Sequence, residues 1–192
     1  MVRLLIFLFM LFSVVHLSPL YGQSDRCKET TRGPAIDWTP DVKLKWSDFR
    51  NAKKGKVAFS VASSSCGFGY NGFVQGAEIR VSVFVRFYCE ESWKESGFSQ
   101  ADVLQHEQLH FDICELYGRK LYQGIQALRA KDRLNEKNLQ KLYDSLVKEY
   151  DEFQDRYDRE TKHSTVGGKQ KEWNERISKE LDRLAAFADY KE

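Results

Sequence analysis

The sequence has little of the residues that mark unusual classes of protein. Its 192 residues include 3 prolines and 12 glycines, too few for a low-complexity or fibrous chain. The 4 cysteines are too few for a disulfide-dense small domain, and no Cys-x-x-Cys spacing supports a thiolate zinc site. The formal net charge is +2, so no strong field attracts the protein to nucleic acid or to anionic membranes. The 42% of hydrophobic residues suffices for the core of one ordinary domain.

The first 22 residues have the layout of a secretory signal peptide. Arg3 precedes an apolar run of about 12 residues, and helix-breaking residues follow this run up to Gly22. A membrane-spanning helix needs about 20 apolar residues, which makes the run too short. We therefore expect residues 1–22 to be removed. The mature chain, 23–192, is then a single soluble domain with an extended segment over 23–41, and it is secreted or periplasmic.

Export affects the interpretation of Cys27, Cys66, Cys89 and Cys114. An even number of cysteines in an oxidising compartment usually forms disulfides, and four cysteines allow three pairings. We favour a Cys66–Cys89 bond, because both residues lie in strand-like sequence. Buried free thiols are the alternative.

Residues 42–88 are typical of an antiparallel sheet of three or four strands. Apolar residues alternate with mostly polar ones from Ile79 to Phe87, which predicts a strand with one face on a core. The segments 56–63 and 68–74 are predicted to be neighbouring strands, with Asn71-Gly72 as a turn signal. A further short strand is expected at 44–49.

The rest of the chain changes to the period of a helix. Ser99 and Asp102 resemble a capping box at the start of the first predicted helix. A second helix is expected from about Asn135, and a third after Gly167-Gly168. The second helix carries its apolar residues on one stripe, namely Leu139, Leu142, Leu146, Tyr150, Phe153 and Tyr157. A small antiparallel sheet followed by three helices predicts an α+β fold.

The first of these helices carries an HExxH motif at residues 106–110. His106 and His110 are four residues apart, so that both imidazoles project from one face and can bind one metal ion. Glu107 lies beside them and can reach a water molecule without ligating the metal. The histidines share the stripe of Ile113 and Tyr117, and buried imidazoles need a hydrogen-bond partner or a metal. A pair of hydrogen-bonded core histidines is the structural alternative.

Catalytic zinc requires a third protein ligand, and His163 is the remaining histidine of the mature chain. An antiparallel pair of helices returns the segment around His163 to the level of the motif. A continuous helix would point His163 about 120° away from the stripe of Tyr157. Either the helix ends near Thr161, or Glu160 is the ligand.

Two runs resemble the bacterial domain-of-unknown-function family 922: HEQLHFD at 106–112 and YDRETKH at 157–163. Members of that family look like secreted zinc-dependent proteases. The resemblance implies a zincin-like domain in which His106 and His110 bind zinc, Glu107 is catalytic and His163 is the third ligand. Ser164 stands where the resemblance leads us to expect glycine.

The predicted function is a secreted zinc metallopeptidase that acts on a peptide or protein substrate. Zinc lowers the pKa of a bound water, Glu107 acts as general base, and Tyr157 or Tyr117 donates to the developing oxyanion. An exposed strand edge near 79–87 is expected to hold the extended peptide. The alternatives are a cell-envelope binding module with a structural metal or none, and a metal-dependent hydrolase with another substrate.

Overall fold

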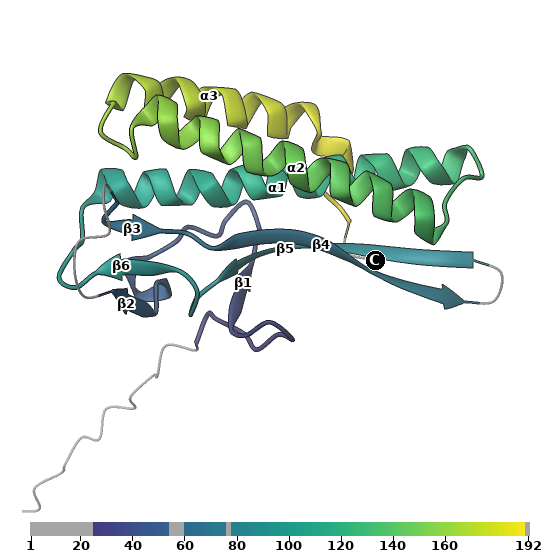
Figure 1. The fold of residues 1–192 in the computed structure, drawn as a ribbon, viewed down its shortest axis with the longest axis horizontal. Coiled ribbons are helices and arrows are strands. Elements are labelled where there is room, and N and C mark those ends of the chain that lie inside the picture. The colour runs from purple at the N-terminus through teal and green to yellow at the C-terminus, as the bar shows by residue number, and fades with distance from the viewer. Residues whose placement is uncertain (1–24, 54–59, 76–77, 191–192) are drawn as a thin grey trace, which may run out of the picture.

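A computed structural model describes residues 25–53, 60–75 and 78–190, so the expected signal peptide lies outside the described residues. The three helices of these ranges all lie on one side of a layer of strands (Figure 1). The described strands form two sheets of three strands each. In the first sheet, β5 (Glu78–Tyr88) lies between β1 (Ala35–Asp37) and β4 (Cys66–Gln75), and both pairings are antiparallel. The α+β class predicted from the sequence is confirmed.

The second sheet is smaller. Its central strand, β6 (Trp93–Glu95), pairs parallel with β2 (Asn51–Lys53) and antiparallel with β3 (Ala62–Ser63). β3 is thus an edge strand within the described part of the chain. The single sheet expected from the sequence is wrong, because the stretch around β3 pairs with β6 and not with β4.

The strand predicted at 79–87 is confirmed as β5. Its inward residues Val81, Val83, Val85 and Phe87 are buried, as the alternation predicts. The predicted turn at Asn71-Gly72 is wrong. These two residues pair with Ser82 and Val81 inside a ladder that continues to Gln75. Regular pairing along ten residues of β4 outweighs a local turn preference.

The strand expected at 44–49 is also wrong. This stretch contains a 3-10 turn, η1 (Trp46–Asp48). The carboxylate of Asp48 accepts a hydrogen bond of 2.7 Å from the Lys45 N–H, which closes the turn. The segment expected to be extended at 23–41 contains β1, which attaches it to β5.

The three helices are α1 (Ala101–Ala130), α2 (Glu136–Thr161) and α3 (Gly167–Arg183), followed by the short η2 (Ala185–Phe187). α1 lies between the strands and the other two helices (Figure 1). α2 begins as predicted, with the Asn135 side chain accepting the Asn138 N–H. The capping box expected at Ser99 is wrong, since the N-cap is Gln100 without a side-chain cap. No helix of the described residues has the length and apolarity to cross a membrane.

A glycine sets the distance between α1 and the first sheet. A Cβ atom at Gly118 would collide with the side chain of Val85 on β5. Close packing of α1 on β5 therefore needs glycine at this point. This contact fixes the position of the helix that carries the HExxH motif.

The disulfide of the structure joins Cys27 to Cys89, with a Cα–Cα distance of 6.4 Å. The favoured Cys66–Cys89 pair is wrong, and Cys66 and Cys114 are free thiols. The register explains the difference. Cys66 pairs with Phe87, whereas the Lys28–Ala35 bridge and the Ala35–Tyr88 pair carry the N-terminal segment to Cys89.

Candidate metal centre

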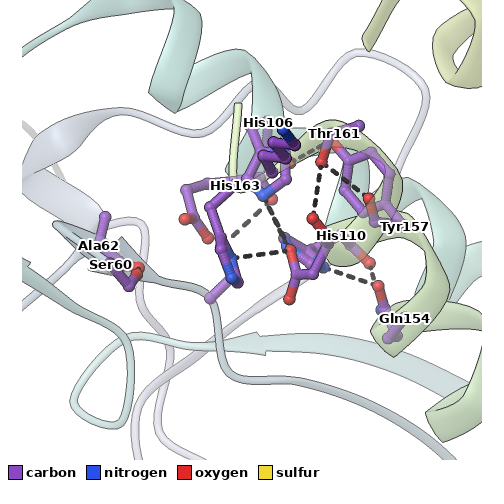
Figure 2. Close-up of polar contacts among 12 residues, drawn as sticks. Ser60, Ala62, His106, His110, Gln154, Tyr157, Thr161 and His163 are labelled. Carbon is purple, nitrogen blue, oxygen red and sulfur yellow. Dashed lines mark hydrogen bonds and ion pairs between the residues drawn. The ribbon is translucent and has the colours of Figure 1, made fainter. Parts of the chain in front are cut away.

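The two histidines of the HExxH motif face each other on the second and third turns of α1. The Nε2 atoms of His106 and His110 are 3.2 Å apart. His106 is only 2% exposed, and the His110 side chain is 13% exposed. Figure 2 shows His106, His110 and His163 gathered next to α2. Consecutive turns of one helix therefore present two imidazole nitrogens to the same point, as the spacing predicts.

Two glutamines hold the other nitrogen of each ring. His106 Nδ1 lies 3.1 Å from Oε1 of Gln170, and His110 Nδ1 lies 2.7 Å from Oε1 of Gln154. The Nε2 group of Gln154 donates to the carbonyl oxygen of His110, and that of Gln170 donates to Asn174. Both amide oxygens thus accept from an Nδ1–H group. This arrangement leaves each Nε2 lone pair for a proton or a metal ion.

Asp158 completes a triangle of donor atoms. Its Oδ1 atom lies 3.0 Å from Nε2 of His106 and 3.1 Å from Nε2 of His110. Ligands bound tetrahedrally to zinc at about 2.05 Å stand about 3.3 Å apart, close to the sides of this triangle. Among the described residues these three form the one group of metal-type donors within 4.8 Å of one another. Their geometry and chemistry fit a single divalent cation.

Charge in the triangle is balanced by a proton when no metal is bound. Burial lowers the pKa of His110, but the hydrogen bond and the charge of Asp158 outweigh it and raise that pKa to about 9. For Asp158, burial raises the pKa, but the hydrogen bonds from His106 and His110 leave it well below its usual range. A carboxylate and two imidazoles at this distance fit a positive charge between them, which a proton or a metal ion would provide.

Glu107 is the most unusual carboxylate of the site. It is 4% exposed, and its Oε2 atom has no hydrogen-bond partner among the described residues. Most buried polar atoms are hydrogen-bonded, because an unpaired one is costly. Glu107 therefore brings a carboxylate oxygen without a protein partner to the cavity that His106 and His110 also line.

These residues form part of the wall of a cavity of about 940 Å³. Residues 60–66 lie across it from the motif, and α2 and residues 163–165 form other parts of the wall. Ser60 and Ala62 stand opposite the histidines in Figure 2. The Ser64 hydroxyl donates to the Glu107 carbonyl oxygen at 3.2 Å, which fixes this side of the cavity to α1.

His163 lies at the rim, where the sequence places it. α2 ends at Thr161, and Lys162, His163 and Ser164 have φ values of 48°, 50° and 75°. His163 Nδ1 lies 3.5 Å from Asp158 Oδ1, and the side chain is 45% exposed. His163 therefore contacts the triangle through Asp158. Glu160, the other residue considered, accepts from the Trp173 indole at 2.9 Å and so faces α3.

Tyr157 packs against His106 and does not face the cavity. Its ring stacks on His106 with 4.6 Å between centroids, and the residue is fully buried. Its hydroxyl lies 3.1 Å from the His106 carbonyl oxygen and 2.9 Å from Gln170 Oε1. Tyr157 is not among the residues that line the cavity. Its position fits a positioning role better than the expected donation to an oxyanion. Tyr117 donates instead to the Glu149 carbonyl oxygen.

The sequence analysis missed Asp158, Gln154 and Gln170. A signal for the first two is present in α2, where Asp151, Gln154, Asp155 and Asp158 form a polar stripe at helical spacing. This stripe runs directly beside the apolar one that packs on α1. Gln170 offers no comparable signal, because its contact with His106 depends on how α3 packs.

The fold and the site define an α+β domain in which an HExxH helix contributes to a His–His–Asp group. Residues 89–164 match the family model described as "Bacterial protein of unknown function (DUF922)", which supports the resemblance of this segment to that family. The matched segment includes all of α1 and α2 and ends one residue after His163. No curated protein and no solved structure matches the chain.

Proposed function

We propose that the protein is a zinc-dependent metallopeptidase with a zincin-like site. His106, His110 and Asp158 would hold the metal, and Glu107 would act as general base. The observation that carries this proposal is the triangle of three donor atoms, 3.0 to 3.2 Å apart, beside a buried carboxylate oxygen without a partner. A structural zinc site usually has four protein ligands, whereas a catalytic one has three.

Zinc bound at this site would lower the pKa of a water molecule to near 7 and polarise the scissile carbonyl. Glu107 would take a proton from the attacking water through Oε2 and deliver it to the leaving amine. Gln154 and Gln170 keep the two imidazoles in the orientation that presents Nε2. The protein thus supplies a prearranged base and prearranged ligands.

His163, the third ligand expected from the sequence, would act on Asp158 from the open side of the cavity. Its Nδ1 atom lies within ion-pair distance of the carboxylate, but it is not part of the triangle. We assign it the role of orienting Asp158, which leaves a coordination position for water.

The substrate would lie along the edge strand β3. The edge expected at 79–87 does not line the cavity, and β1 pairs with residues 86–88 of that side of β5. Residues 60–65, which include β3, line the cavity beside the HExxH helix. An extended peptide could add to the free side of this strand by main-chain hydrogen bonds.

The proposed location is outside the cytoplasm. The pattern of residues 1–22 and the Cys27–Cys89 disulfide both fit export to an oxidising compartment. The two observations are independent, since the disulfide lies in the described part of the domain.

Peptidase activity of the zinc-loaded protein tests the proposal. We expect the wild type to cleave a degenerate peptide library, and Glu107→Gln to bind zinc equally but to turn over about 10²- to 10⁴-fold more slowly. Glu136→Gln, on an exposed residue in the first turn of α2, is the matched control. Equal turnover by Glu107→Gln, or no cleavage by the wild type, contradicts the proposal.

A further inference from the structure

The cavity beside the metal-type group is negatively charged, in contrast to the chain as a whole. Five carboxylate residues are among those that line it: Asp102, Glu107, Asp151, Asp155 and Asp158. None of the described residues lining it is lysine or arginine. The complete sequence, with 30 basic and 28 acidic residues, has a small net positive charge. The carboxylates are therefore concentrated at this place.

Three of the five have no role in the proposed chemistry. Asp158 contacts the imidazoles, and Glu107 is the proposed base. The structure shows no ion pair to Asp102, Asp151 or Asp155 within the described ranges of the chain. All three are exposed, so that a ligand entering the cavity can reach them.

Asp151 and Asp155 carry like charges one turn apart on α2. Such i,i+4 pairs destabilise a helix. Burial and then the charge of Asp155 raise the pKa of Asp151. Two nearby cations of α2 contact other groups: Arg156 lies over the Phe153 ring, and Lys148 is 4.0 Å from Glu152. The cavity wall therefore stays negative, although the same helix carries cations.

We infer that the cavity selects substrates with a lysine or arginine side chain close to the bond that is cleaved, and that Asp151 and Asp155 bind this side chain. The inference rests on the proposed peptidase function and adds its substrate class. The unpartnered Oε2 of buried Glu107 marks where the reacting bond lies, and the two aspartates stand on the neighbouring wall of the same cavity. An ammonium or guanidinium group supplies the positive charge that this wall lacks.

Three degenerate peptide libraries test the inference. They differ only at one fixed position, which holds arginine, its neutral analogue citrulline, or glutamate. We expect the zinc-loaded wild type to cleave the arginine library about tenfold faster than the citrulline library. Two exposed ion pairs together should stabilise the bound arginine peptide by about this factor. Glutamate should be poorest. The preference should shrink in 1 M salt, because screening weakens exposed ion pairs.

The variant Asp151→Asn/Asp155→Asn should lose the preference for arginine, so that it cleaves the arginine and citrulline libraries at rates within about twofold of each other. Asp144→Asn/Glu152→Gln is the matched control: it removes two exposed acids of α2 that do not line the cavity, and it should keep the preference. An unchanged preference in the Asp151→Asn/Asp155→Asn protein overturns the inference and leaves the proposed function standing.

Equilibrium binding separates the two proposals. Zinc-loaded Glu107→Gln, which should hardly turn over, should bind the arginine library about tenfold more tightly than the citrulline library. Adding Asp151→Asn/Asp155→Asn to it should remove the difference. Equal binding of both libraries overturns the inference whether or not the wild type is a peptidase. Selective binding together with no cleavage by the wild type supports the inferred cation site and overturns the peptidase proposal.

Discussion

Gln154 holds His110 at two points. Its Oε1 atom lies 2.7 Å from the ring Nδ1, and its Nε2 group donates to the carbonyl oxygen of the same histidine at 3.1 Å. Because the carbonyl oxygen can only accept, the amide orientation is fixed and the ring nitrogen must donate. A neutral His110 therefore presents an unprotonated Nε2 toward Asp158 and His106.

Loss of this contact should weaken metal binding. We expect Gln154→Ala to lower zinc affinity about 10- to 100-fold, as for other groups that orient a ligating histidine. Competition with a chelator of known affinity measures the effect. Gln140→Ala removes a glutamine on the exposed side of α2, where it bonds Asp144, and should leave the affinity unchanged. Similar affinities of the Gln154→Ala protein and the wild type would show that the contact does not orient the ring.

The metal-free protein should become less stable as the pH rises. The folded pKa of His110, about 9, is above the ordinary value of 6.5, so its stabilisation is complete below pH 6.5 and is lost between pH 6.5 and 9. The folded pKa of Asp158 is lowered, so its stabilisation is lost as the pH falls below the ordinary value of 3.8. Urea unfolding with a chelator present should show the free energy of unfolding falling from pH 6.5 to 9. Asp158→Asn should flatten this fall, and equal slopes in both proteins would rule out the pair as its cause.

Glycine should be more stable than the native serine at position 164, in the turn after α2. Ser164 has a φ of 75°, a conformation that disfavours residues with a Cβ by about 1 kcal/mol. We expect Ser164→Gly to raise the free energy of unfolding by up to about 1 kcal/mol. Ser178→Gly, at an exposed position inside α3, should lower it by about 0.5 kcal/mol. Destabilisation by Ser164→Gly would mean that the serine side chain has a structural role there.

The Cys27–Cys89 disulfide should contribute substantially to stability. It joins residues 62 positions apart, and loops of this length are typically stabilised by about 2–4 kcal/mol. The variant Cys27→Ser/Cys89→Ser should lose that amount in urea unfolding. Alkylation of the unfolded, unreduced protein followed by mass spectrometry should label Cys66 and Cys114 alone. Label on Cys27 or Cys89 would contradict the pairing.

Periodic patterns predicted the parts of the fold that depend on local sequence. The buried alternation of β5 and the start of α2 at Asn135 are both confirmed. The turn at Asn71-Gly72 and the Cys66–Cys89 bond are wrong for one shared reason. Strand register decides both, and register depends on pairing between distant segments that a single sequence does not specify.

The sequence also predicted only part of the candidate site, namely its histidines and Glu107. Helix spacing places His106 and His110 together, and antiparallel helices bring His163 near them. The contact from Asp158 was not predicted, because the search for a third ligand favoured histidine. Only the packing angle between α1 and α2 decides which residue of the returning helix reaches the two imidazoles.

Zinc content of purified variants tests the central claim most directly. We expect one zinc per chain in the wild type, loss in His110→Ala and in Asp158→Ala, and retention in His163→Ala. Circular dichroism of each variant would confirm that the fold is intact. A wild type that binds no stoichiometric metal, or an Asp158→Ala protein that retains zinc while His163→Ala loses it, would contradict the assignment of His106, His110 and Asp158 as the metal ligands.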